Sequence, residues 1–275
     1  MNFAVVSSEQ DEAGMNIFRC IHEEIPSLNH YLIKEDSIHA ENIDKSLLKN
    51  YDFIIFATRH KSQEHRKTFS VHAPGNWKNA EFGGRGGKVC KTSALFLKHL
   101  FKTLSQETKK MKSDYECTLE CTHHGPFIEK PCCFIEIGTT KEEWQDKLSA
   151  RIIAEIIKRA INSFNEKENW KPAIAIGGPH YCPNFNKIQL NSEYAISHII
   201  PEYALPLTEE MIKEAIEKTI EPIDCILLDW KGLGKSEERK WVIDLLSRLN
   251  LKYKRTNEVE KQKVLYLRAS SGHKI

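Results

Sequence analysis

The sequence predicts an α/β protein built on a mixed, mostly parallel sheet with helices on both faces. Short apolar runs of strand length alternate along the 275 residues with segments whose apolar positions recur every three or four residues. No linker rich in proline, glycine or serine, no repeat and no low-complexity tract interrupts this alternation. We therefore expect a single domain over residues 1–275, with a subdivision near 165–171 as the alternative.

The predicted strands are of two kinds. Most are continuous apolar runs, typical of strands buried on both faces; they cover residues 2–6, 52–57, 132–137, 173–176, 194–200, 225–229 and 264–267. Residues 115–122 instead alternate between apolar and polar side chains, which predicts a strand with two different faces. Cys117 and Cys121 would lie about 13 Å apart along it, too far to share one ion, so we assign both to the core.

Capping residues and helical spacing mark the predicted helices. They place helices after Ser8, over residues 91–112, from the capping box Thr140–Glu143, from Thr208 and from Ser236. The helix over 91–112 turns its apolar residues inward and its lysines outward.

Composition limits the class of protein. Forty Lys and Arg face 38 Asp and Glu, so no polybasic coat is present. Residues 85–112 nevertheless hold eight basic residues and one acid, and residues 252–275 hold seven against two. These blocks fit either phosphate contacts with a nucleic acid or solvated helix faces. Eight cysteines, no signal peptide and no apolar run of about 20 residues predict a cytoplasmic protein with reduced thiols and no membrane span.

Candidate chemistry gathers in four segments that follow predicted strands, where open α/β sheets bind ligands: 59–60, 70–77, 120–126 and 177–181. A single histidine there is more often a hydrogen-bonded loop residue, but several together favour acid–base or metal chemistry. We expect one reaction centre formed by His72, Glu120, His123, His124 and His180, with His60 as a weaker candidate. Glu120 could orient an imidazole, bind a metal or act as a base; alternatively it faces solvent.

Local metal motifs are absent: the sequence has no HExxH, no paired CxxC and no Cys/His finger. The glycine-rich residues 83–88 precede a predicted helix and fit either a flexible loop or an anion-binding loop, with Arg85 and Lys88 as phosphate contacts. Phe82 and Val89 replace the glycine and hydroxyl of a Walker loop, and no strand precedes a GxGxxG pattern, so no dinucleotide is expected.

Three of these segments resemble the archaeal and plant type of D-aminoacyl-tRNA deacylase. They read SVHAPGNW at 70–77, ECTHHGP at 120–126 and GGPHY at 177–181, in this order over the whole chain. Pro179 and Ala73 depart from the glycine and threonine usual there. The resemblance implies hydrolysis of the ester joining a D-amino acid to the terminal ribose of tRNA, a chiral proofreading and tRNA-recycling activity. It also implies Zn²⁺ and an α/β fold related to peptidyl-tRNA hydrolases and nucleoside phosphorylases.

Chemistry at the matching positions suggests individual roles. No GxSxG elbow or papain-like cysteine is present, which favours direct attack by water. We predict zinc ligands among His72, His123, His180 and Glu120, and contacts with the 3′ end of aminoacyl-tRNA from Asn76, Gly178, Tyr181, Arg85 and Lys88. Backbone N–H groups near Gly178 would hold the oxyanion. The alternatives are a non-catalytic tRNA-binding protein and a phosphorylase-like enzyme that cleaves nucleosides; we expect a monomer.

Overall fold

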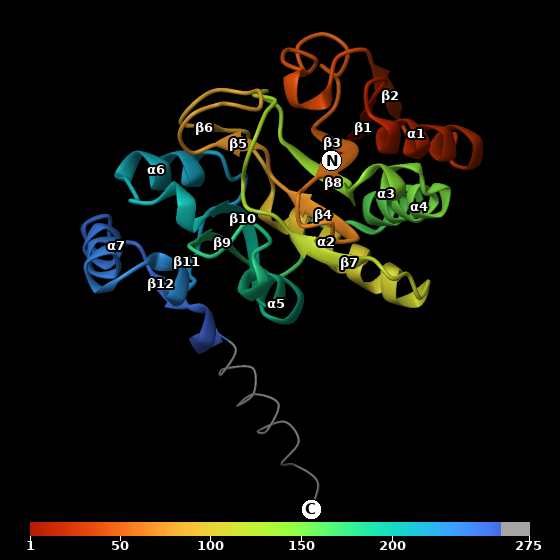
Figure 1. Ribbon diagram of the computed structural model, residues 1–275. Helices are drawn as coiled ribbons and strands as arrows, with labels where there is room; N and C mark the ends of the chain where they lie inside the picture. Colours follow the sequence, from red (N-terminus) through yellow and green to blue (C-terminus); the bar gives the residue numbers. More distant parts are fainter. Residues whose placement is uncertain (260–275) are drawn as a thin grey trace, which may run out of the picture.

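Two sheets form the framework of the computed structural model, which describes residues 1–259 (Figure 1). The larger sheet has the strand order β2 (His30–Ile33), β1 (Phe3–Ser8), β3 (Phe53–Lys61), β8 (Cys132–Thr139), β4 (Thr68–His72) and β7 (Glu116–Leu119). The smaller has the order β10 (Tyr194–Ile200), β9 (Lys171–Ile176), β11 (Cys225–Leu228) and β12 (Tyr253–Arg255). All pairs within these sheets are parallel except β4 with β8. The predicted mostly parallel α/β class is confirmed.

Seven α-helices connect the strands of the described chain. They are α1 (Glu12–Glu24), α2 (Ala94–Lys110), α3 (Lys141–Gln145), α4 (Lys147–Ser163), α5 (Pro183–Asn191), α6 (Glu209–Glu217) and α7 (Ser236–Arg248). Short 3-10 helices cover η1 (Ser37–His39), η2 (Glu202–Ala204) and η3 (Trp230–Leu233), and a small hairpin pairs β5 (Gly75–Asn76) with β6 (Lys88–Val89).

The helix ends differ from the sequence prediction at two places. Ser8 belongs to β1, and Asp11 caps α1 by accepting the N–H of Gly14. The predicted capping box between Thr140 and Glu143 is present, but it opens only α3, because Asp146 ends that helix and caps α4. Asp146 is polar and short, so it competes with the helical backbone for hydrogen bonds.

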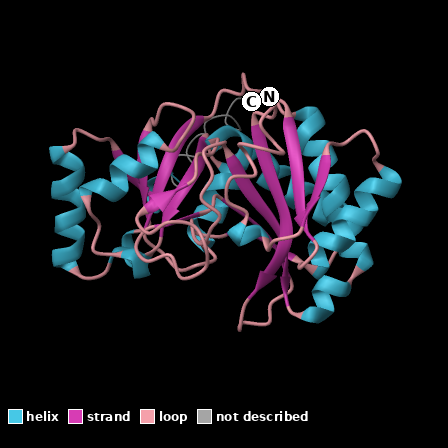
Figure 2. Cartoon of the chain, turned by 90° about the horizontal axis from the view of Figure 1, so that it is seen from above, coloured by secondary structure: helices cyan, strands magenta, loops and turns pink. Residues whose placement is uncertain are grey.

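Alternating side chains give the larger sheet two different faces. Residues such as Val5 and Ile55 pack beneath helices, in one apolar cluster that also includes residues of the smaller sheet. Their neighbours Val6 and Phe56 form the opposite face, which is covered mainly by the irregular chain around Leu48. The smaller sheet has helices on both faces, α6 and α7 on one and α5 on the other. Figure 2 shows the two sheets next to each other, with helices on their outer sides.

The irregularly covered face of the larger sheet becomes polar toward one end, and this places the site. Along β3 the side chains on this face run Ile54, Phe56, Thr58 and His60, and all four are buried. Glu136 of β8 follows Phe134 on the same face. Since a side-chain period of two keeps these residues on one side, the apolar core leads directly into a group of buried polar residues.

Several elements were not predicted. Residues 59–60 and 70–72 were expected in loops, but β3 extends to Lys61 and β4 covers Thr68–His72. The predicted strand over residues 115–122 is shorter in the structure, where β7 covers only Glu116–Leu119. No counterpart was predicted for β2, β12 and α5. The predicted strand 264–267 lies outside the described residues. Within residues 1–259, no helix has the length and apolar character required to cross a membrane.

Candidate active site

The structure brings the five predicted site residues together with His60. His72 ends β4, Glu120 to His124 follow β7, and His180 lies in the loop after β9. The imidazole centroids of His72 and His123 lie 4.3 Å apart, those of His123 and His180 4.6 Å, and those of His123 and His124 4.3 Å. His60 reaches the same group, with its ring 6.0 Å from that of His180.

Three of these histidines expose the same nitrogen to the site. The Nδ1 atom of His72 lies 3.2 Å from the Ala73 carbonyl, that of His123 lies 2.9 Å from the Cys121 carbonyl, and that of His124 lies 2.6 Å from the Gly125 carbonyl. A carbonyl oxygen only accepts hydrogen bonds, so each Nδ1 carries the proton. In the neutral form of each ring, the lone pair on Nε2 therefore points into the site.

Two buried carboxylates face these lone pairs. Glu120 is 1 % and Glu136 2 % exposed. His72 Nε2 lies 3.6 Å from Glu136 Oε2, and His123 Nε2 lies 3.5 Å from Glu120 Oε2. Nε2 lone pairs and carboxylate oxygens are all acceptors, so these groups require a donor or a cation between them.

His60 lies between the two carboxylates and compensates part of their charge. Its Nδ1 atom is 3.1 Å from Glu120 Oε1 and 3.3 Å from Glu136 Oε2, while its Nε2 atom is 3.0 Å from the Tyr181 hydroxyl. Gly138, opposite His60 in the β3–β8 register, makes room for the ring, because a Cβ there would lie 2.8 Å from His60 Cβ.

The electrostatics of the site divide its histidines into two groups. Burial lowers the pKa of His124 to about 4 and moves that of His123 well below its ordinary value, with help from neighbouring imidazoles. Burial would also lower the pKa of His60, but Glu120 and Glu136 outweigh it and raise that pKa. The same contacts outweigh the desolvation of both carboxyls and lower their pKa values. These shifts favour the neutral form of His123 and His124 and the charged form of His60.

Cys121 belongs to the main apolar cluster, as the alternating pattern predicted, and its thiol also contacts the site. It lies beyond the end of β7, with its Sγ atom 3.3 Å from His180 Nδ1 and 2.9 Å from the Tyr203 hydroxyl. His180 Nε2 lies 3.0 Å from Glu120 Oε2. Burial alone would lower the pKa of His180, but the contacts with Cys121 and Glu120 raise it to about 11.

Glu136 is the main site residue that sequence reasoning missed. It lies in the middle of the predicted strand 132–137, whose other residues are apolar or small. A single carboxylate within a strand buried on both faces requires a partner, and this signal could have identified it. Cys121 gave no comparable signal.

The residues predicted to bind substrate have different environments. Tyr181 contacts His60 directly, whereas Asn76 donates to the Gly83 carbonyl at 2.9 Å and so holds the glycine-rich loop. Gly178 has a φ of +83° and packs against Asp229, where a Cβ would meet Oδ2 at 2.9 Å. Its predicted oxyanion role stays a prediction.

Some basic side chains of the predicted blocks already have partners within the protein and are not available to a nucleic acid. Lys88 is paired with Glu214 at 2.8 Å, and Lys98 is buried, donating to three backbone carbonyls at 2.5–3.0 Å. Most of the block 252–275 lies outside the described residues. Arg85 has no ion-pair partner among residues 1–259 and lies against Phe127, 4.8 Å from the ring centroid.

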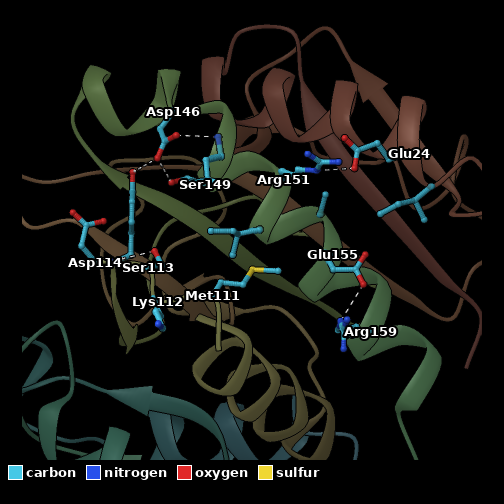
Figure 3. Close-up of a pocket in the computed structure, with 15 residues that line it drawn as sticks. Glu24, Met111, Lys112, Ser113, Asp114, Asp146, Ser149, Arg151, Glu155 and Arg159 are labelled. Carbon is cyan, nitrogen blue, oxygen red and sulfur yellow. Dashed lines mark hydrogen bonds and ion pairs between the residues drawn. The ribbon is translucent and has the colours of Figure 1, made fainter. Parts of the chain in front are cut away.

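A surface depression of about 640 Å³ lies away from this chemistry (Figure 3). It is formed by the ends of α1 and α2 and by α4, with Met111, Tyr115 and Leu148 among its lining residues. None of the predicted site residues lines it. The side-chain chemistry, rather than the size of this depression, therefore locates the candidate active site.

The acceptor-rich centre fits a metal ion. His72 Nε2, Glu120 Oε1 and Glu136 Oε2 are buried and make no hydrogen bond of good geometry, although His60 Nδ1 approaches the two carboxylate oxygens. Ligand atoms lying within 4.8 Å of one another form four groups in the described chain: His72–His123–His124, Cys121–His123–His180, His60–Glu120–His180 and His72–Glu120–Glu136. His72 and His180, both predicted ligands, share none of these groups. Backbone carbonyls that fix the Nδ1 protons of His72, His123 and His124 are typical outer partners of metal-binding histidines.

Fold and site together are typical of an α/β enzyme, with histidine and glutamate side chains gathered at its candidate active site. A family model described as D-aminoacyl-tRNA deacylase matches residues 47–254. A D-aminoacyl-tRNA deacylase of Archaeoglobus fulgidus is 35% identical over 254 residues, covering 86% of this chain and 90% of the relative. One from Pyrococcus abyssi is 33% identical, covering 92% of this chain and 91% of the relative.

A crystal structure of a conserved protein of unknown function has the same fold. It superposes with a TM-score of 0.85 at 32% identity, covering 94% of this chain and 97% of the other. The chain belongs to the D-aminoacyl-tRNA deacylase family.

Proposed function

We propose that this protein hydrolyses the ester joining a D-amino acid to the terminal ribose of tRNA, and that the histidine–glutamate site performs the reaction. Relatives named D-aminoacyl-tRNA deacylase that match most of the chain support the substrate class. The observation that carries the site assignment is the convergence of three Nε2 lone pairs on two buried carboxylates. Such a centre can activate water and needs no covalent nucleophile.

We propose Zn²⁺ as the cofactor, held by His72, His123 and His124. Three imidazoles whose Nδ1 atoms are fixed by carbonyls are a common ligand set for catalytic zinc, with a fourth position open. This set retains two of the predicted ligands and replaces His180 by His124, because His72 and His180 share no group within 4.8 Å. When bound there, Zn²⁺ supplies a positive charge that acidifies water to a pKa of about 7.

The remaining side chains handle protons and charge. Glu120 Oε1 lies 3.1 Å from His60 Nδ1 without a hydrogen bond of good geometry, and it is our candidate to accept the proton of the attacking water. His60 compensates the charge of both carboxylates through Nδ1. His180, held between Glu120 and Cys121, provides a second positive charge beside the ester, which stabilises the developing oxyanion.

We further propose that residues 1–275 act as one unit, a monomer of the cytoplasm. A single apolar cluster joins residues of both sheets, which supports one unit rather than two domains. All eight cysteines are free thiols, as expected in a reducing compartment.

Parallel incubation with D-tyrosyl-tRNA and L-tyrosyl-tRNA tests the function. Release of D-tyrosine with the L-ester left intact supports the deacylase. Tight tRNA binding without release would instead indicate a non-catalytic tRNA-binding protein. Release of a free base that depends on phosphate would indicate a phosphorylase-like enzyme.

Metal content tests the cofactor separately. We expect zinc in the purified protein, loss of activity on chelation and recovery on adding Zn²⁺. His124→Ala should lower the zinc content, whereas the control His22→Ala, on the exposed side of α1, should retain it. Metal-free protein with full activity would refute the zinc proposal. The histidine and glutamate side chains would then perform the acid–base chemistry without a metal.

A further inference from the structure

Phe127 carries two cations beside the candidate active site. The Arg85 guanidinium carbon lies 4.8 Å from its ring centroid, and the Lys218 ammonium nitrogen lies 5.6 Å from it. Arg85 comes from the glycine-rich loop, and Lys218 comes from the end of α6. Within residues 1–259 neither cation has an ion-pair partner, unlike Lys88, whose charge is compensated by Glu214. The two cations are therefore available for an anionic ligand.

The backbone around this aromatic ring is fixed. The Cys90 thiol donates to the Pro126 carbonyl at 3.1 Å and accepts the Ile128 N–H at 3.3 Å, which holds the chain on both sides of Phe127. The Lys218 carbonyl accepts the Thr92 N–H at 2.9 Å. The ring and the segments that carry its cations thus form a preorganised site, and little ordering cost remains on binding.

The cation pair lies close to the reacting centre. Phe127 follows His124 by three residues, a span of at most about 10 Å. Gly125 packs against the glycine-rich loop, since its N–H donates to the Phe82 carbonyl at 2.9 Å and a Cβ on Gly84 would lie 3.1 Å from Gly125 Cα. Arg85, next to Gly84, is therefore placed beside the loop that carries His123 and His124.

We propose that Arg85 and Lys218, held against Phe127, bind a phosphodiester of the last nucleotides of tRNA. Guanidinium and ammonium groups bind phosphate oxygens, and contact with the ring restrains their motion. The proposal rests on the proposed function, because that function places an esterified ribose at the histidines. It also transfers the phosphate role predicted for Lys88 to Lys218.

Two substrates with the same ester separate phosphate binding from chemistry. We would compare D-tyrosyl-tRNA with 3′-O-D-tyrosyl-adenosine, which lacks every phosphate. For R85A/K218A we expect the ratio of kcat/KM between tRNA and the adenosine ester to fall about 10–100-fold, mainly through KM. The slope of log(kcat/KM) against log[salt] should flatten by about 0.7 for each cation that is removed. F127L, which retains apolar bulk, should lower the ratio about threefold.

R248A is the matched control. It removes a guanidinium that lies 5.3 Å from the Trp241 ring on α7, so the ratio of the two substrates should stay constant. A ratio within twofold of wild type in R85A/K218A would overturn the proposal, as would an equal loss on both substrates.

Binding of uncharged tRNA tests the same proposal without activity. R85A/K218A should bind full-length tRNA at least tenfold more weakly than wild type. With tRNA that lacks its 3′-terminal CCA, the two proteins should bind equally. An equal loss on both tRNAs would overturn the acceptor-end site. If wild-type protein hydrolyses neither ester, the proposed function fails, and this binding comparison still decides whether the cations contact the 3′ end.

Discussion

Replacing His60 by Asn should expose the electrostatic cost of the two buried carboxylates. His60 Nδ1 lies 3.1 Å from Glu120 and 3.3 Å from Glu136, and all three side chains are nearly inaccessible. At an effective dielectric constant of 20, each contact corresponds to an attraction of about 5 kcal/mol. Desolvation cancels part of this attraction, so H60N should lower the free energy of unfolding by about 3–5 kcal/mol, as for other broken buried pairs.

A double-mutant cycle isolates the cause. In an E136Q background only one carboxylate remains, so H60N should cost about 2 kcal/mol less than in wild type. The pKa of His60 is raised, so its stabilisation is complete below its ordinary pKa of 6.5 and is lost as the pH rises through the raised value.

Urea unfolding in EDTA at several pH values measures these energies. H22N is the control, because His22 is exposed and should change stability by no more than about 0.5 kcal/mol. A cost of less than 1 kcal/mol for H60N, or an equal cost in both backgrounds, would show that His60 does not compensate the charge of the two carboxylates.

Three further changes test other parts of the structure. Burial lowers the pKa of His198 from 6.5 to about 4, so the free energy of unfolding should fall by about 3 kcal/mol as the pH is lowered from 6.5 to 4. Urea titrations of His198→Gln should lack this pH-dependent loss. Lys98→Met leaves three carbonyls without their donor, two of them buried, and should cost at least about 3 kcal/mol in urea unfolding; a loss below 1 kcal/mol would contradict this. Gly138→Ala should displace His60 and lower kcat on D-tyrosyl-tRNA about tenfold, so unchanged turnover would show that the His60 position is not critical.

The sequence predicted the class of fold because long apolar runs and helical spacing are local properties. It did not predict two sheets, since alternation of elements does not say which strands pair. β4 was missed because it is not a continuous apolar run: polar Thr68, Ser70 and His72 alternate with Phe69 and Val71. The early end of α3 was missed because Trp144, Leu148 and Ile152 keep a helical spacing across Asp146.

The histidines of the candidate site could be predicted from the sequence, but the groups that contact them could not. His72, His123 and His180 lie in motifs that sequence reasoning singled out, and strand-end loops of an α/β protein tend to meet. The roles of individual nitrogens depend on contacts with carbonyls, which spacing does not reveal. Long-range pairs were equally hidden: Lys88 finds Glu214 126 residues away, and Cys121 meets Tyr203 82 residues away. Only Glu136 left an unused signal, as a charge inside a buried strand.

The most direct test of the account is the single-turnover hydrolysis of D-tyrosyl-tRNA by His123→Ala with enzyme in excess. His123 contributes a lone pair at the centre of the site and lies against His72, His124 and His180. We predict that the rate of D-tyrosine release falls at least 100-fold while the Kd for uncharged tRNA stays within twofold of wild type. Release at the wild-type rate would contradict the claim that this histidine–glutamate centre performs the chemistry.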